Sequence, residues 1–250
     1  MMKRITVLTS IILFAVNIYA APSTTDLNEA QVGKLATAYF KSHPEKMLEI
    51  MQSMQQALKE QQYNGVKRTL IKHRNFLLSK ELPEIGPTQA SKTLIFFFDY
   101  QCVYCHKQYS ELEQLLKKDS SFKIIFVPLH LFGQASLYAS KMGLYFNHLH
   151  RFSEFNAALE KENLIEGRLS DRAVNAIALK LGVNLVEAKR FINSKEANDL
   201  INKITQLQAQ LGIQATPMIF TLPIRQTKLT VNDIHVIQGY VPINQLKSLI

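Results

Sequence analysis

Two cysteines, Cys102 and Cys105, are the residues whose type and spacing best support chemistry, and the sequence contains no others. Two residues separate them, so on a helix the thiols would lie one turn apart. Such a pair can exchange two electrons by closing and opening a disulfide. A disulfide across so short a loop restrains little of the unfolded chain, so the spacing favours redox chemistry over a structural crosslink.

The residues around this dithiol predict a strand followed by a helix. The apolar, aromatic-rich run from Thr93 to Phe98 predicts a buried strand. After Tyr104, polar residues alternate at helical spacing with apolar ones, which predicts an amphipathic helix. Cys102 should therefore lie at a helix N-terminus, where unpaired amides and the helix dipole favour a thiolate.

Metal-based interpretations of the same residues remain open as alternatives. Zinc needs two ligands besides a Cys-x-x-Cys pair, and the sequence offers no other cysteine and no histidine pair at ligand spacing. Cys102, Cys105 and His106 also spell Cys-x-x-Cys-His, the attachment signature of c-type haem. A hydrophobic strand directly before the motif is typical of redox dithiols instead. Thiolates also bind soft Cu(I), so a copper-binding or holdase module is a further alternative. The redox interpretation requires no metal and no cofactor.

Residues 1–21 have the features of a secretory signal peptide. Lys3 and Arg4 precede an apolar run, and small residues follow at Ala20 and Ala21. The apolar run is short for a membrane span, so we expect cleavage and export to the periplasm. An oxidising compartment of this kind suits disulfide chemistry.

The chain carries a formal net charge of +9. Its lysines are scattered and no aromatic platform accompanies them, so we expect no nucleic-acid partner.

Residues 22–82 predict a helical N-terminal arm. Apolar residues recur at helical spacing before and after a break at His43 and Pro44, and Asn64 with Gly65 predicts a second interruption. The stripe after the first break consists of Met47, Met51, Met54 and Leu58. A narrow apolar stripe on a polar helix outside the redox domain has little local core to cover. We therefore expect residues 27–62 to form a homodimer.

Residues 83–250 predict an α/β catalytic domain. Residues 83–92 have the composition of a linker. Further strands are expected at 122–127, 217–222 and 234–238, a helical insert at about 134–212, and a terminal helix at 242–250. The insert should break near residue 151, at 167–170 and at 182–184. With the dithiol after the first strand, this order matches a thioredoxin fold with a helical insertion, preceded by the helical arm.

Four segments of the sequence resemble the DsbA-like thiol:disulfide interchange proteins, and more closely their exported subgroup with an N-terminal helical dimerisation arm. These segments are SHPEKMLE, FFFDYQCVYCHK, HLFGQASLYASK and ATPMIF. The resemblance implies a periplasmic protein of the thioredoxin superfamily, often dimeric, that makes, breaks or reshuffles disulfides in other exported proteins. A Cys-x-x-Cys dithiol together with a Thr-Pro pair is a fairly specific combination for such a resemblance.

The resemblance also implies roles for individual residues. Cys102 corresponds to the attacking, exposed thiolate and Cys105 to the buried resolving thiol. Thr216 and Pro217 correspond to a cis-proline loop that faces the dithiol and binds substrate, and Val103 and Tyr104 modulate the motif. Proline tolerates the cis peptide and donates no hydrogen bond, which leaves neighbouring backbone free to pair with a substrate strand. A trans proline that merely starts a strand is the alternative.

The sequence departs from the family pattern at two positions. Related proteins commonly place a buried acid six residues before the first cysteine, where this chain has Phe96, and Asp99 is a doubtful substitute. His130 stands where similar proteins often have a proline, and we interpret it as a surface or loop residue.

The motif does not separate oxidase from isomerase. An oxidase would need a membrane oxidase as redox partner, whereas a dimer with two clefts favours isomerase or dual activity.

Overall fold

The computed structural model describes residues 28–162 and 169–249. The predicted signal peptide, residues 1–21, lies outside the described residues. The chain forms two compact units that divide between Gln56 and Ala57. Across the described part of the chain, no helix is long and apolar enough to cross a membrane.

The first unit contains helix α1, Glu29–Ser42, and the beginning of helix α2, Pro44–Lys72. A reciprocal pair of hydrogen bonds between Asn28 and Gln31 caps the start of α1. The break at His43 is confirmed, and Pro44 opens α2 because the first turn of a helix needs no proline N–H. The predicted interruption at Asn64 and Gly65 is wrong, since α2 runs through both residues.

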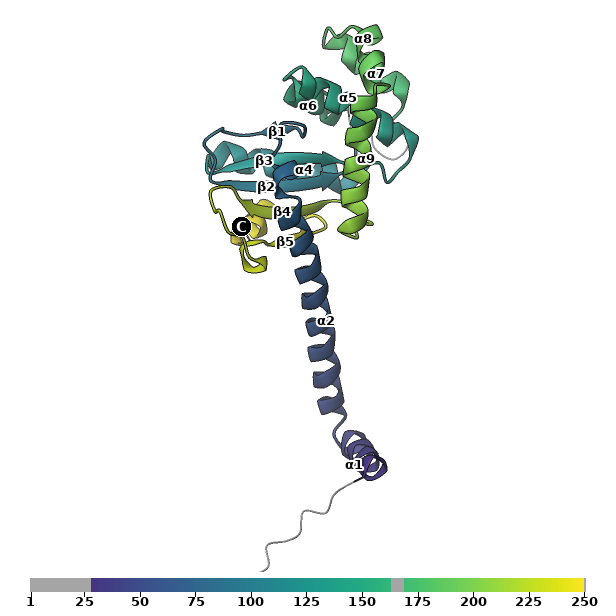
Figure 1. Ribbon diagram of the computed structural model, residues 1–250, viewed down its shortest axis with the longest axis vertical. Helices are drawn as coiled ribbons and strands as arrows, with labels where there is room; N and C mark the ends of the chain where they lie inside the picture. The colour runs from purple at the N-terminus through teal and green to yellow at the C-terminus, as the bar shows by residue number, and fades with distance from the viewer. Residues whose placement is uncertain (1–27, 163–168, 250) are drawn as a thin grey trace, which may run out of the picture. The chain divides into compact units, whose positions relative to one another are not determined.

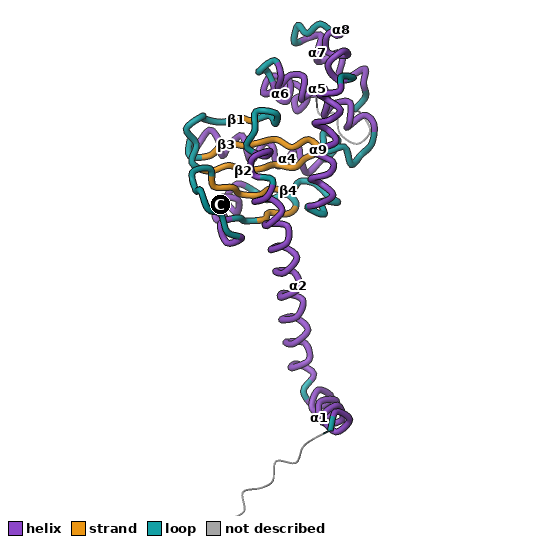
Figure 2. The backbone as a smooth tube through the Cα atoms, viewed as in Figure 1, coloured by secondary structure: helices purple, strands orange, loops and turns teal. Residues whose placement is uncertain are grey.

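The second unit is organised on a five-stranded sheet in the order β1-β3-β2-β4-β5 (Figure 1; Figure 2). Strand β2 is parallel to β3 and antiparallel to β4, while β1 and β5 are antiparallel additions at the two edges. The strands are β1 Glu84–Ile85, β2 Lys92–Phe98, β3 Phe122–Pro128, β4 Met218–Pro223 and β5 Val236–Gln238. The strands predicted from sequence are confirmed to within two residues at each end. Strand β1 falls in the expected linker, because two residues are too few to show a period.

Side chains of β2 alternate between two apolar clusters, one on each face of the sheet. Phe96 and Phe98 enter the first cluster with both cysteines, whereas Ile95 and Phe97 enter the second. Successive side chains of a strand point to opposite faces, so a strand buried on both faces has an unbroken apolar sequence. This explains the run of apolar residues before the dithiol.

Helices cover both faces of this sheet. Helix α4, Val103–Lys118, connects β2 to β3 and packs in the first cluster. Helix α9 contributes to the second cluster and runs beside the sheet (Figure 1). Helices α5 to α8 lie together to one side of the sheet (Figure 1). The remaining helices are α3 Arg74–Leu77, α5 Gln134–His148, α6 Phe152–Glu162, α7 Asp171–Lys180, α8 Leu185–Ile192, α9 Lys195–Gln210, the short 3-10 turn Val231–Asp233, and α10 Ile243–Leu249.

The helices of the insert end close to where the sequence predicted. The breaks near residue 151 and at 182–184 are confirmed, and the predicted break at 167–170 lies partly outside the described residues. A further break at Ser194 was not predicted, and its side chain caps α9 by accepting a hydrogen bond from the amide of Ala197.

The division between the units falls well before the predicted arm boundary at residue 82. Leu70, Leu77 and Leu82 are buried in the second cluster, against the sheet. The end of α2 therefore belongs to the compact unit that carries the dithiol. Only the part of α2 before residue 57 groups with α1.

Candidate active site

The structure places the dithiol at the junction of β2 and α4. Cys102 is the N-cap of α4, and its Sγ accepts a hydrogen bond of 3.3 Å from the amide of Cys105. Both thiols are free in the structure. The preceding turn is held by the Cys102 amide, which donates to the carbonyl of Asp99 at 3.0 Å. The predicted position at a helix N-terminus is confirmed.

The pKa values of the two thiols are shifted in opposite directions. The hydrogen bond from the Cys105 thiol is the largest cause that lowers the pKa of Cys102, to about 6. Burial opposes this effect, and hydrogen bonds from Thr216 and from the amides of Cys105 and Tyr104 add to it. The pKa of Cys105 is raised, first by burial and then by the hydrogen bond and charge of Cys102. At neutral pH the site therefore holds one thiolate and one thiol.

Both sulfurs are more enclosed than the family resemblance implied for the first one. Cys102 is only 5% exposed and Cys105 is 2% exposed. The Cys102 side chain is covered in part by the loop before β4, whose Thr216 carbonyl lies 3.4 Å from its Sγ.

The loop with Thr216 and Pro217 comes from 114 residues further along the chain and faces the dithiol. The Thr216–Pro217 peptide bond is cis, as the resemblance implied. The buried Thr216 hydroxyl lies too far from any acceptor or donor, or at too poor an angle, for a regular hydrogen bond. It is nevertheless close enough to both sulfurs to lower the pKa of each. The Pro217 carbonyl accepts from the amide of Gly239 at 2.9 Å, which ties the loop to the end of β5.

Val103 and Tyr104, the two residues between the cysteines, differ in exposure. Val103 is half-buried, whereas Tyr104 is 57% exposed and has the Lys107 ammonium 5.4 Å from its ring centre. Phe132, in the loop after β3, is exposed to the same extent. Its carbonyl accepts a hydrogen bond of 3.1 Å from the side chain of Gln101, next to Cys102. No sequence pattern pointed to Phe132, because a single aromatic residue in a loop has no periodicity.

Asp99 organises the loops around the dithiol, a role that the sequence did not predict. Its carboxylate is fully buried and accepts from the amide of Gln101 at 2.8 Å, the amide of Phe132 at 3.2 Å and the hydroxyl of Ser136 at 2.6 Å. These bonds join the turn before Cys102 to the loop after β3 and to the start of α5. The sequence feature that could have indicated this role is the position of Asp99, a polar residue directly after a buried strand.

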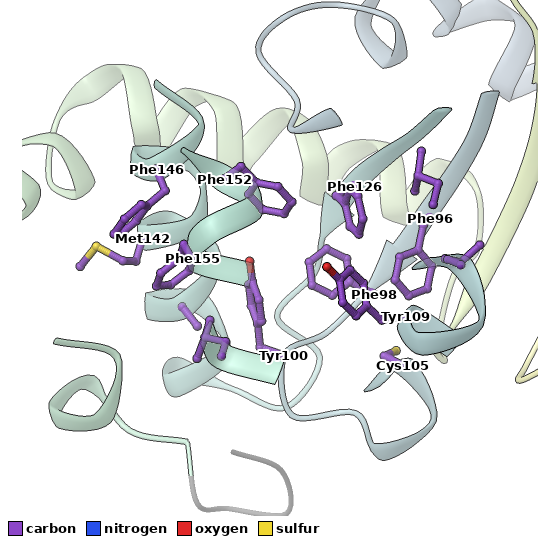
Figure 3. Packing of buried hydrophobic residues seen from close by; sticks show 14 of the residues in the cluster. Phe96, Phe98, Tyr100, Cys105, Tyr109, Phe126, Met142, Phe146, Phe152 and Phe155 are labelled. Atoms are coloured by element: carbon purple, nitrogen blue, oxygen red, sulfur yellow. The ribbon is translucent and has the colours of Figure 1, made fainter. Parts of the chain in front are cut away.

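Phe96 occupies the position where related proteins place a buried acid. Its side chain is 1% exposed, stacks on Phe98 with ring centres 5.3 Å apart and meets Phe126 edge-on. Figure 3 shows these rings on the same side of the sheet as Cys105 and Tyr109. This position therefore contributes packing and no proton-transfer group.

Two other residues that the sequence singled out lie at the edge of the site or beside it. His130 is a half-buried residue of the loop after β3, with Nε2 3.5 Å from the Thr205 hydroxyl. His106, the histidine of the haem signature, has both ring nitrogens in hydrogen bonds, with the Glu160 carboxylate and the Tyr100 carbonyl. Neither nitrogen is therefore available as an axial ligand in this structure. Among the described side chains, no group of three or more His, Cys, Asp or Glu residues could hold a metal ion.

Comparisons with known proteins agree with this geometry. The DSBA-like thioredoxin domain family matches residues 93–250, which is more than half of the chain. The chain belongs to this family, and the predicted fold is confirmed. No curated protein matches the sequence.

Solved structures with the same fold are distant in sequence. BcfH from Salmonella enterica Typhimurium is 22% identical, with a TM-score of 0.74 over 88% of this chain and 93% of its own. The thiol-disulfide exchange protein alpha-DsbA2 from Wolbachia pipientis is 22% identical, with a TM-score of 0.59 over 74% and 94%. A periplasmic thioredoxin-like protein from Salmonella enterica serovar Typhimurium is 23% identical, with a TM-score of 0.55 over 71% and 92%.

Proposed function

We propose that the chain is an exported thiol:disulfide oxidoreductase that forms or isomerises disulfides in other exported proteins. The observation that carries this proposal is the opposite shift of two adjacent thiols, with the pKa of Cys102 at about 6 and that of Cys105 raised. A thiolate beside a protonated thiol can attack a disulfide and then be released by its neighbour.

The reaction begins with Cys102. Its thiolate attacks one sulfur of a client disulfide, so a mixed disulfide forms and the other client sulfur leaves as a thiolate that takes up a proton. Cys105 then loses its proton and attacks the Cys102 sulfur. This closes the Cys102–Cys105 disulfide and releases the second client thiol, so the client gains the two electrons that the dithiol loses. The same steps in reverse oxidise a client.

Four residues around the sulfurs are proposed to hold the client. The Thr216 carbonyl lies beside Cys102 Sγ, and an extended client segment can pair with the backbone of Thr216, directly before Pro217. Val103 and the exposed ring of Tyr104 would contact apolar side chains next to the client cysteine.

Export to the periplasm is part of the same proposal. It is supported by the signal-like sequence of residues 1–21 and by the periplasmic relative named above. As an oxidase, the protein would need a membrane oxidase that keeps the dithiol closed, whereas an isomerase must stay partly reduced.

We also propose that the arm joins chains, most simply as a homodimer. Helix α1 contains no buried residue, and several large apolar side chains of the first unit are exposed. They are Val32, Leu35, Tyr39, Met47, Leu48, Ile50, Met51 and Met54. Packing such surfaces together contributes about 25 cal/mol per Å² of apolar area removed from water. Two dithiols held on one assembly would favour isomerisation of a shared client.

A trapping experiment tests the central proposal. Cys105→Ser should accumulate mixed disulfides with clients through Cys102, because no second thiol remains to release them. Cys102→Ser is the matched control and should trap none. Refolding of a scrambled client by the unmodified protein then separates isomerase from oxidase activity. Failure to trap or exchange, together with tight Cu(I) binding by the reduced protein, would favour the copper-binding alternative.

A further inference from the structure

His106 and Glu160 form a partly buried pair beside the dithiol that the proposed reaction does not use. His106 lies in the first turn of α4, and Glu160 comes from α6 in the helical insert. His106 Nδ1 lies 2.5 Å from a Glu160 carboxylate oxygen, and the two side chains are only 12% and 17% exposed. The other ring nitrogen, Nε2, lies 2.9 Å from the carbonyl oxygen of Tyr100.

These contacts define the protonation of the ring when the Glu160 carboxylate is ionised. A carbonyl oxygen can only accept a hydrogen bond, so Nε2 carries a hydrogen. An ionised carboxylate also only accepts, so Nδ1 carries one as well. A histidine protonated on both nitrogens is an imidazolium cation.

The pKa of His106 agrees with this protonation. Burial lowers it, but the hydrogen bond and charge of Glu160, the Tyr100 carbonyl and the charge of Cys102 raise it by more, so it lies above its ordinary value. The charged and titratable groups acting on the ring are therefore Glu160 from α6 and Cys102 from its own helix.

Two hydrogen bonds join His106 to the backbone of the turn that carries the nucleophile. The amide of His106 donates to the carbonyl of Cys102 at 3.2 Å, and the His106 ring holds the carbonyl of Tyr100, two residues before Cys102. His106 thus connects the turn before Cys102 to the first turn of α4 through two hydrogen bonds. If a thiolate at Cys102 favours the imidazolium, the imidazolium must favour the thiolate equally, because their interaction is mutual.

We propose that His106 is a positioning residue that stabilises the Cys102 thiolate as an imidazolium, and that Glu160 of the helical insert keeps it charged. The insert would then contribute to the acidity of the dithiol as well as to packing. This proposal rests on the proposed function for its purpose, but its test follows a single thiol and needs no client protein.

The test measures the rate of Cys102 alkylation against pH by mass spectrometry, in the full mature protein. His106→Gln removes the cation and leaves Glu160 unpaired, so the pKa of Cys102 should rise by about half a unit or more. His106→Lys restores a cation and should return the pKa close to that of the parent. Glu160→Gln should also raise it, because the neutral partner no longer holds the proton on His106.

A matched control lies on the same helix. Glu162, two residues after Glu160, forms an exposed ion pair with Lys180, and Glu162→Gln should leave the pKa of Cys102 unchanged. NMR titration of His106, assigned by its loss in His106→Gln, should show a raised pKa in the parent and a lower pKa in Glu160→Gln.

The proposal is overturned if His106→Gln and His106→Lys change the pKa of Cys102 equally, which would show a role in packing alone. It is also overturned if NMR titration gives the same pKa for His106 in the parent and in Glu160→Gln. Because trapping of clients by Cys105→Ser is measured separately, a protein that fails to trap would refute the proposed function without altering these results.

Discussion

We expect the reduction potential of the dithiol to change its pH dependence near pH 6. Below the pKa of Cys102, reduction takes up two protons with two electrons, so the potential falls by about 59 mV per pH unit. Above it, Cys102 stays a thiolate and one proton is taken up, so the slope falls to about 30 mV per pH unit. The position of the break follows from the pKa of Cys102, about 6. Cys105 adds no second break in this range because its pKa is raised.

The same shift predicts how the stability of the reduced form changes with pH relative to the disulfide form. The pKa of Cys102 is lower in the folded protein than in the unfolded chain, so its contribution is complete above the unfolded pKa and is lost as the pH falls through about 6. With an unfolded pKa of 9.0, the loss between pH 7 and pH 5 is about 1.4 kcal/mol. The pH-dependent contributions of other groups are nearly the same in the reduced and disulfide forms, so they largely cancel when the stabilities of the two forms are compared.

Equilibration with a dithiol buffer between pH 5 and pH 8, followed by acid quenching and mass spectrometry, measures the potential at each pH. Thr216→Val removes the hydroxyl that lowers the pKa of Cys102, so the break should move to higher pH. Thr69→Val is the matched control, because the Thr69 hydroxyl donates to the Gly65 carbonyl within α2. A slope of about 59 mV per unit that persists to pH 8 would refute the thiolate and, with it, the assigned roles of the two cysteines.

Three further predictions, one of them with a control substitution at Gly65, concern packing and the arm. Phe96→Glu should speed the step in which Cys105 loses its proton, followed by stopped flow, and should lower the free energy of unfolding by about 3 kcal/mol because it buries a carboxyl among aromatic rings. Gly143→Ala should lower the free energy of unfolding by about 1–3 kcal/mol, since its Cβ would lie 2.6 Å from the Tyr100 hydroxyl. Gly65→Ala, whose Cβ meets nothing within 4 Å, should instead raise it by about 0.5–1 kcal/mol. Deletion of residues 1–56 should give a folded monomer by light scattering that keeps insulin reduction and loses isomerase activity.

Each of these predictions has a result that contradicts it. An unchanged rate in a folded Phe96→Glu protein would mean that another group already accepts the proton of Cys105. Equal denaturant midpoints for the parent and Gly143→Ala would show that the Tyr100 ring moves aside without cost. A full-length protein that is monomeric at micromolar concentration would remove the proposed role of the arm, and a monomeric deletion variant that still isomerises at the parent rate would remove the argument for isomerase activity.

The elements around the dithiol could be predicted from the sequence because their signals are local. The apolar run ending at Phe98 and the helical spacing after Tyr104 depend on neighbours within one or two turns, and they were enough to place Cys102 at a helix N-terminus. The helical insert and the strand after Pro217 were predicted for the same reason. The predicted break at Asn64 and Gly65 failed because the surrounding helix tolerates a single glycine at modest cost.

Other features depend on residues that only folding brings together. Thr216 reaches Cys102 from 114 residues away, and Glu160 reaches His106 from 54 residues away. The division of the chain after Gln56, well before the predicted boundary at residue 82, depends on burial of Leu70 against strands that come later in the sequence. A periodic pattern states which face of an element is apolar, but it does not state which other element covers that face. The sequence therefore determined the dithiol and its helix, and the packing of distant elements decided which groups surround the two sulfurs and set their acidity.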